Sequence, residues 1–327
     1  MHRPFNLRRL AVALALVVTA AAAPAASYNS LVVFGDSLSD SGNNALAIGA
    51  DPGQVISGNS YIPSQPYASL TYSNGPVWVD SFASMLNLSV TPSLAGGTNF
   101  AYGGARTMRN TGPFPPGLRD QVDSYLGLTG GVAAADALYV IAGGGNNARD
   151  ALEAIAGGAP LVQTLAAAGL QYASNVGRMV DQLQAAGAQH IVVWNTPNLA
   201  YAPAVAAEGA LAQGLGQAVA SFMNQVLGQR LQGEVGVTTF DLFGLLGQAV
   251  ADPGAYGFTD VTNACGAVVG CDPSSYLFWD GIHPTSGGHQ LLAQSMFAAV
   301  VPETGTVWMF SAGLALLLAG ARRRRRG

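Results

Sequence analysis

Four short runs of apolar residues, spaced widely along this chain, most restrict the folds that it can adopt. The runs cover residues 31–34, 137–142, 190–194 and, with fewer apolar side chains, 235–240. Such runs are typical of strands that are buried on both faces, as in parallel sheets. The sequence between them has helical character, most clearly in the alanine-rich residues 161–186. Strands that alternate with helices predict an α/β fold, a three-layer α/β/α sandwich around a parallel sheet.

Two segments rich in Gly, Pro, Ser and Asn interrupt this alternation, at residues 49–80 and 251–279. We expect both to form long loops over one edge of the sheet, a position where long ordered loops are often functional. No internal repeat, coiled coil or linker divides residues 27–301. We therefore expect these residues to form one large domain.

The first 26 residues have the three-part layout of a secretory signal peptide. Three arginines lie within the first nine residues, an apolar or small run covers residues 10–23, and Ala-Pro-Ala at 23–25 suits cleavage after Ala25 or Ala26. The apolar run is short for a membrane span, which disfavours a permanent N-terminal anchor. We therefore expect the chain to be exported and this segment to be removed by signal peptidase.

Residues 302–327 also have an organised pattern. An apolar stretch at 306–321 precedes five consecutive arginines, which the positive-inside rule keeps on the cytoplasmic side. With Pro302-Glu303 before it, this arrangement resembles the PEP-CTERM sorting signal of Gram-negative bacteria, in which an exosortase removes the tail. Thr304 stands where that signal usually has a second proline. The resemblance implies transient anchoring in the inner membrane and then release to the cell surface or outside; permanent anchoring is the alternative.

The charge of residues 27–301 disfavours several classes of partner. These residues hold six of the fourteen basic side chains, all arginine, and seventeen of the eighteen acidic ones, which gives a net charge near −11. So acidic a surface disfavours nucleic acids and anionic membranes as partners. Membrane contact is therefore expected only through the C-terminal tail.

The two cysteines of the chain, Cys265 and Cys271, both lie in the exported part. An oxidising compartment predicts a disulfide between them, which stabilises the fold by about 2 kcal/mol for so short a loop. A metal site would need further ligands of suitable type nearby, and the surrounding sequence has none. We therefore expect a disulfide and no metal.

Small or polar side chains follow the predicted strands at the points where these end. Ser37 follows the first strand, Gly104 ends a short extended run, and Asn146 follows the second strand. Asp280 and His283 lie in a late loop that can fold over the same edge of the sheet. Because the carboxyl ends of parallel strands meet at one edge, we expect these side chains to converge there.

Such a cluster suits acyl transfer. A serine hydroxyl is a poor nucleophile until a base takes its proton, and an imidazole oriented by a carboxylate is a common base. His283 lies three residues after Asp280, near enough for the carboxylate to reach its Nδ1, although an isolated Asp-x-x-His also fits an ordinary loop hydrogen bond. Of the other histidines, His190 opens a predicted strand and is expected to be structural, and His289 is expected at a helix cap or on the surface.

The reaction also requires donors for the oxyanion of the tetrahedral intermediate. The backbone N–H groups of Ser37 and Gly104 are candidates, since small residues allow a carbonyl group to approach, and Asn146 supplies a side-chain amide. The glycine-rich residues 143–147 lack the Lys and Ser/Thr of a phosphate-binding loop. No Gly-x-Gly-x-x-Gly opens a helix after the first strand, so no nicotinamide cofactor is expected either.

These blocks together resemble the SGNH hydrolases, also called GDSL esterases and lipases. The matching sequences are Gly35-Asp36-Ser37-Leu38, the glycines within residues 99–105, Gly144-Gly145-Asn146-Asn147 and Asp280-Gly281-Ile282-His283. Residues 73–78 and 278–285 are similar to the lipase and phospholipase-like branch of that family. Asn147 departs from the pattern, because the family usually has an Asp in this supporting position.

The resemblance implies a flavodoxin-like sandwich that carries a serine hydrolase site without cofactor or metal. The nucleophile would be Ser37, activated by His283 and Asp280, and the oxyanion hole would use Ser37, Gly104 and Asn146. Supporting roles fall to Asp36, Gly103 and Asn147.

The expected activity is that of an exported esterase or lipase acting on carboxylic esters. Two alternatives remain open, a deacetylase of exopolysaccharide with the same fold and a catalytically silent protein of the extracellular matrix. We expect the choice of substrate to depend on the segments at residues 49–80 and 105–135.

Overall fold

The computed structural model describes residues 28–49, 67 and 70–301. The predicted signal peptide at 1–26 and the predicted sorting tail at 302–327 lie outside these residues, as does most of the segment 49–80. Within the part of the chain that is described, no helix has the length and apolarity needed to cross a membrane.

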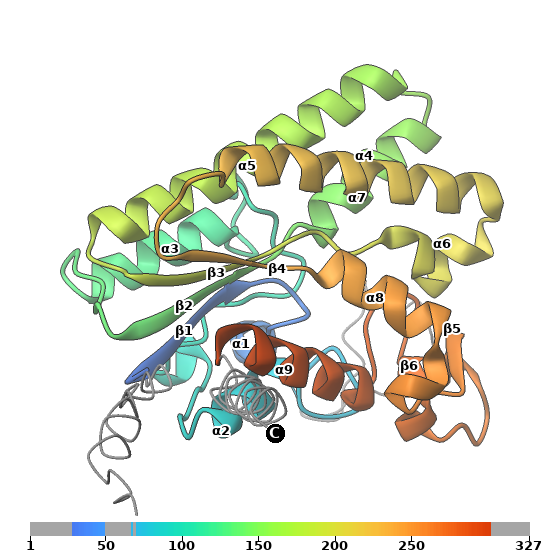
Figure 1. The fold of residues 1–327 in the computed structure, drawn as a ribbon, viewed down its shortest axis with the longest axis horizontal. Coiled ribbons are helices and arrows are strands. Elements are labelled where there is room, and N and C mark those ends of the chain that lie inside the picture. Colours follow the sequence, from blue (N-terminus) through green and yellow to red (C-terminus); the bar gives the residue numbers. More distant parts are fainter. Residues whose placement is uncertain (1–27, 50–66, 68–69, 302–327) are drawn as a thin grey trace, which may run out of the picture. The chain divides into compact units, whose positions relative to one another are not determined.

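Four parallel strands form the central sheet in the order β1-β2-β3-β4 (Figure 1). Their bounds are Ser30–Gly35, Ala137–Ala142, His190–Trp194 and Val237–Phe240. The four apolar runs thus predicted the strands correctly, and only β4 begins later than expected. Gly236, directly before β4, has a φ of 73°, which ends the extended backbone on that side.

An extended segment at residues 98–102 lies along the free edge of β1. Val33 donates its N–H to Thr98 O at 3.0 Å, and Phe100 donates to Val33 O at 2.8 Å. With this segment counted, the order from edge to edge is that of a flavodoxin-like sheet. The point where the order reverses lies beside the carboxyl end of β1, which is where ligands bind in such sheets.

Helices cover both faces of the sheet and complete the predicted three-layer sandwich (Figure 1). One face carries α3 (Leu118–Leu128), α4 (Gly145–Ala156), α5 (Leu161–Ala185) and α7 (Ala210–Arg230). The other face carries α1 (Asn43–Ile48), α2 (Trp78–Met85) and α9 (Ser286–Val300). The short α6 (Pro203–Ala207) precedes α7, and α8 (Leu242–Ala251) follows β4. The longest helix, α5, confirms the prediction for residues 161–186.

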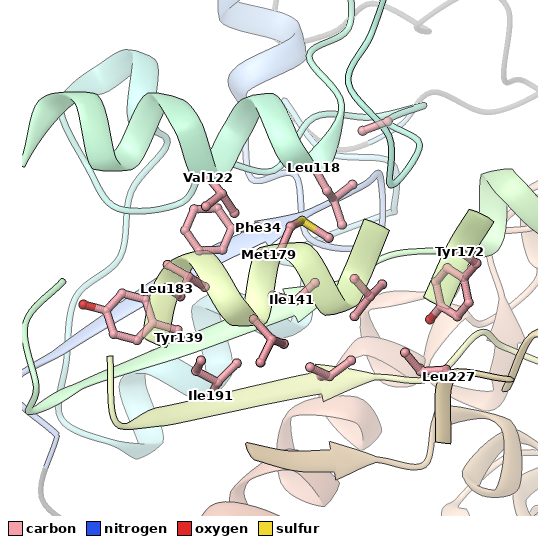
Figure 2. Packing of buried hydrophobic residues seen from close by; sticks show 14 of the residues in the cluster. Phe34, Leu118, Val122, Tyr139, Ile141, Tyr172, Met179, Leu183, Ile191 and Leu227 are labelled. Carbon is pink, nitrogen blue, oxygen red and sulfur yellow. The ribbon is translucent and has the colours of Figure 1, made fainter. Parts of the chain in front are cut away.

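The larger part of the core lies between the sheet and α3, α5 and α7 (Figure 2). Tyr139, Ile141 and Ile191 project from the strands toward Met179 and Leu183 of α5, and all five are buried. On the opposite face Trp194 stacks against Trp78 of α2 with ring centroids 4.6 Å apart. Since both faces of the strands are covered, nearly every strand residue is apolar, which is why the runs could be recognised in the sequence.

The segment 251–279 is not the long loop that its composition predicts. It contains a second, two-stranded parallel sheet of β5 (Asp260–Ala264) and β6 (Tyr276–Phe278). A disulfide between Cys265 and Cys271, with Cα atoms 5.6 Å apart, closes the turn that follows β5. Strands this short and polar carry no recognisable periodicity, so the prediction was wrong here.

Short 3₁₀ helices connect several of these elements. They are η2 (Ser93–Ala95), η3 (Leu199–Tyr201), η4 (Pro253–Tyr256), η5 (Cys265–Ala267) and η6 (Pro273–Ser275). Three of these five lie within residues 251–279. This segment therefore contains more regular structure than its composition suggests.

His289 does not lie on the surface or at a cap, as the sequence suggested, but is buried on α9 with 1% of its surface exposed. Its Nδ1 accepts the backbone N–H of Trp78 at 3.3 Å, which connects α9 to the first turn of α2. This bond leaves the proton of the neutral ring on Nε2, which is buried and has no hydrogen-bond partner among the described residues. His190, by contrast, is exposed at the start of β3 and packs edge-on against the ring of Tyr28.

The burial of His289 makes the stability of the fold depend on pH. Burial, and next the charge of His283, lowers the pKa of His289 to about 3, against about 6.5 in the unfolded chain. Between these two values only the unfolded chain binds the proton. The free energy of unfolding therefore falls on acidification by about 1.4 kcal/mol per pH unit from this group alone.

We expect His289→Asn to make the acid dependence of stability shallower, because the amide can accept the Trp78 N–H without titrating. The measurement is urea denaturation at several pH values between 7 and 4. His190→Asn, which changes an exposed histidine, is the control. An equal slope in the His289 variant and the wild-type protein would contradict the assignment.

Candidate active site

Ser37 lies on a tight turn directly after β1. Gly35 ends the strand, and a Cβ at this position would lie 2.8 Å from Ala142 O, so only glycine allows the two strand ends to come this close. The carbonyl of Asp36 accepts the N–H groups of Ser39 and Asp40, both at 3.0 Å, and its Oδ1 accepts that of Leu38 at 3.1 Å. Asp36 therefore fixes the turn that presents Ser37.

The Asp36 carboxyl is itself fully enclosed by the protein. Burial raises its pKa to about 6, although the Leu38 N–H and the positive charge of His283 act in the opposite direction. The carboxyl group accepts the Leu38 N–H and in this way serves as an acceptor for the turn.

His283 joins Ser37 to Asp280 through its two ring nitrogens. Nε2 lies 2.8 Å from Ser37 Oγ, and Nδ1 lies 2.6 Å from Asp280 Oδ2. Asp280 and His283 each have 1% of their surface exposed. The structure thus brings together three side chains that the sequence separates by almost 250 residues, in the arrangement that activates a serine hydroxyl.

The carboxylate of Asp280 is held by donors on both oxygens. Oδ1 accepts the backbone N–H groups of Ile282 at 2.7 Å and His283 at 2.6 Å. Oδ2 accepts the Tyr67 hydroxyl at 2.6 Å in addition to the imidazole. Burial raises the pKa of Asp280, but the charge of His283 and these hydrogen bonds outweigh it and hold the pKa below its usual range.

Tyr67 was not among the predicted site residues. Besides its bond to Asp280, its ring lies edge-on to His283 with centroids 6.5 Å apart, and Tyr72 lies against the same imidazole at 5.3 Å. These two rings exclude water from one side of the histidine. A tyrosine in a polar segment more than 200 residues before Asp280 gives no sequence signal for this role.

A buried carboxylate, also missed in the sequence, connects the Ser37 loop to the predicted oxyanion loop. Asp40 accepts the backbone N–H groups of Gly42 and Asn43 and, at 2.9 Å, that of Gly103. Gly103 lies so close to Tyr72 that a Cβ would be 2.3 Å from its ring, which excludes other residues. Gly104 follows with a φ of 79°, a backbone conformation that glycine adopts without strain.

Asn146 lies in the first turn of α4, directly beyond β2. Its Nδ2 donates one bond to Ala105 O at 3.0 Å, which leaves its second amide hydrogen for another acceptor. Asn147 accepts the Thr107 N–H at 3.0 Å through Oδ1. An acceptor is all that this contact requires, so the Asn found here can replace the usual Asp.

A cavity of about 610 Å³ opens beside Ser37, Asn146 and His283. Its other walls come from α4, from residues 197–215 and from three side chains farther along the chain, Leu246, Phe278 and Ile282. Among the described residues, neither 49–80 nor 105–135 lines this cavity. The second of those segments contains α3 and contributes to a separate pocket of about 200 Å³ next to Gly104.

Potential metal ligands do not gather at this site. In the described ranges there is no group of three or more His, Cys, Asp or Glu side chains that could hold a metal ion. The arrangement of Ser37, His283 and Asp280 can transfer a proton from a hydroxyl to an imidazole without one.

Comparison with known proteins gives consistent results. The family model described as GDSL-like Lipase/Acylhydrolase matches residues 31–296. An uncharacterized protein of Pseudomonas putida from the trpE–trpG intergenic region is 28% identical over 91% of this chain and 53% of its own length. Esterase EstA of Pseudomonas aeruginosa is 29% identical over 87% of this chain and 49% of its own length. A GDSL esterase/lipase of Arabidopsis thaliana is 28% identical over 82% of this chain and 88% of its own length. This chain therefore spans about half the length of the Pseudomonas proteins.

The bond from Tyr67 to Asp280 predicts a pH-dependent loss of stability in Tyr67→Phe. A hydrogen bond to a charged group contributes about 1.5–3 kcal/mol, and the stabilisation of ionised Asp280 is present above its unfolded pKa and lost as the pH falls. We expect the variant to lose this amount of unfolding free energy at pH 7 and progressively less as the pH falls through the lowered folded-state pKa of Asp280, measured by urea denaturation over a descending series of pH values.

Tyr125→Phe is the matched control, because the Tyr125 hydroxyl bonds to that of Tyr139, a neutral partner, at 2.9 Å. Its loss should not depend on pH. No loss of unfolding free energy for Tyr67→Phe at pH 7 would contradict a stabilising bond from Tyr67 to the carboxylate.

Proposed function

We propose, from the premise that this chain belongs to the GDSL-like lipase/acylhydrolase family, that it hydrolyses carboxylic esters with Ser37 as the nucleophile. One observation carries the proposal, the continuous hydrogen-bonded path from Ser37 Oγ through His283 to Asp280. Each bond in this path is already within the range for proton transfer, 2.8 and 2.6 Å. The names of the esterase relatives support the same class of reaction.

In the proposed reaction Ser37 Oγ attacks the ester carbonyl carbon while its proton passes to His283 Nε2. The bond to the alcohol then breaks, and His283 returns the proton to the departing oxygen, which leaves an acyl group on Ser37. A water molecule then attacks the acyl carbon while His283 Nε2 takes its proton. The bond from the acyl carbon to Ser37 Oγ breaks, His283 returns the proton to Oγ, and the carboxylic acid departs. Asp280 keeps the imidazole in the required tautomer and stabilises its charged form.

The oxyanion would be bound by the N–H groups of Ser37 and Gly104 and by the amide of Asn146. Support for this assignment comes from the second amide hydrogen of Asn146, which its bond to Ala105 leaves free. Gly104 has no Cβ to obstruct the oxyanion. Donors that are fixed before the reaction stabilise the developing charge most, because they need no reorganisation.

Asp36, Gly103 and Asn147 have positioning roles in this proposal. Asp36 holds the turn of Ser37, Gly103 connects the oxyanion loop to Asp40, and Asn147 holds the backbone of Thr107. None of the three needs to contact the substrate. We also assign a positioning role to the Cys265–Cys271 disulfide, because it cross-links the segment that precedes the loop of Asp280 and His283.

The chemistry predicts that Ser37→Ala and His283→Ala each lower kcat by about 10⁴-fold or more, because the members of a triad act as a unit. The measurement is hydrolysis of a p-nitrophenyl ester by purified protein, with folding checked by circular dichroism. His190→Ala, an exposed histidine, is the control and should retain the wild-type rate. Full activity in Ser37→Ala would exclude it as the nucleophile.

We also propose that the chain is exported, on the basis of the terminal sequence patterns alone. The signal peptide would be removed near Ala26, and the tail from Pro302 would be removed by an exosortase at the inner membrane. Intact-mass measurement of the extracellular and membrane fractions should then find an extracellular form that lacks roughly 25 residues at each end. Full-length protein with its arginine tail in the inner membrane, in a strain with an active exosortase, would contradict the sorting proposal and leave the esterase proposal unaffected.

A further inference from the structure

We propose that the cavity beside Ser37 binds the acyl chain of the substrate, so that the protein prefers esters of acyl groups with about eight carbons or more to acetyl esters. This inference rests on the proposed function and assigns a part of the substrate to the same site. It also selects among the candidate substrates, because an acetylated glycan would offer only two carbons to this space.

The size of the cavity is the first observation. About 610 Å³ lies within the range of pockets that enclose a whole small ligand, about 300–1,000 Å³. An acetyl group has roughly the volume of two water molecules, about 60 Å³. The acyl part of an acetyl ester would therefore leave most of this cavity unfilled.

The chemistry of the walls is the second observation. Apolar side chains line the cavity beyond the catalytic end, among them Leu152, Val205, Leu211, Leu215, Leu246 and Ile282. The hydroxyl groups of a glycan would find few hydrogen-bond partners against such walls. Each hydroxyl group buried there without a partner would weaken the binding free energy. A hydrocarbon chain instead gains free energy with each methylene group that leaves water.

Few charged residues line the cavity. Asp36 lies at the catalytic end, next to Ser37, and the exposed Glu153 and Glu208 lie toward the solvent. Arg149 lies on α4 between Asn146 and Glu153, and its guanidinium is 3.7 Å from the Glu153 carboxylate. The cavity wall is therefore mainly apolar, with one ion pair on the α4 side.

The order of events at Ser37 assigns this space to the acyl part rather than the alcohol. The alcohol must depart and water must take its place before the acyl-enzyme can react. The acyl chain stays attached to Ser37 Oγ throughout, so its binding does not oppose release of the first product. An apolar enclosure for the alcohol would instead delay both its release and the entry of water.

Alanines on two facing helices keep the cavity open. Ala202 precedes α6 and Ala204 lies within it, while Ala212 lies on α7, and all three line the space. Ala207 is the exposed last residue of α6 and does not line it. This difference within one short helix provides a variant and its matched control.

The experiment measures kcat/KM of the purified protein for p-nitrophenyl esters with acyl groups of two, four, eight and twelve carbons. We expect a rise of about fourfold per methylene at first and at least about 100-fold between the acetyl and octanoyl esters. Acetate esters of alcohols of increasing length form the second series, and kcat/KM should change little along it.

Ala204→Leu should lower kcat/KM for the octanoyl and dodecanoyl esters by at least about tenfold and leave the acetyl ester within about threefold, because the added side chain fills the cavity. Ala212→Leu, from the facing wall, should do the same. Ala207→Leu should leave the whole series unchanged.

The possible failures are distinguishable. Absence of Ser37-dependent hydrolysis of every ester would overturn the proposed function and this inference with it. Ser37-dependent hydrolysis with a flat acyl series, a dependence on alcohol length in place of acyl length, or no effect of either cavity variant would overturn this inference alone.

Discussion

β1 and β2 pair in parallel over their whole length, from Ser30 opposite Ala137 to Gly35 opposite Ala142. With this register both strands end at the same height on one edge of the sheet. The turn of Ser37 leaves the first strand and α4 with Asn146 leaves the second, and the shared level brings these side chains to one cavity. The close approach of Gly35 to Ala142 O has no space for a side chain. A shift of one residue between these strands would separate Ser37 from the Asn146 amide and reverse the faces that the strands bury.

A network of buried polar side chains fixes the loops that follow the strands. The Asn43 amide donates to Asn99 O and Ala101 O, and the Asn99 amide donates to Ser39 O. With Asp40 these side chains join the loop of Ser37 to the extended segment that ends in Gly103 and Gly104. Because each is fully enclosed, a substitution would leave unpaired groups in the interior, so the network specifies one loop geometry.

The strands and the convergence of Ser37, Asp280 and His283 could be predicted from the sequence because each depends on local features, namely an apolar run or a short motif. What could not be predicted depends on contacts between distant segments. Tyr67 bonds to Asp280 across more than 200 residues, and β5 and β6 are too short for a periodic pattern. His289 resembles a surface histidine in sequence, and only the packing of α9 against α2 reveals its burial. The cavity likewise arises from helices whose sequences give no indication of a shared space.

The wall of the cavity and the loop of the base are joined by a backbone hydrogen bond. Ala204 of α6 donates its N–H to Gly281 O at 2.9 Å, in the loop between Asp280 and His283. Ile282 of the same loop lines the cavity, while its N–H binds the Asp280 carboxylate. If the cavity holds an acyl chain as proposed, that chain packs against the elements that hold the imidazole and displaces water from beside them. Hydrogen bonds between charged groups strengthen as water is removed, so in this proposal the bound acyl chain and the activation of Ser37 favour each other.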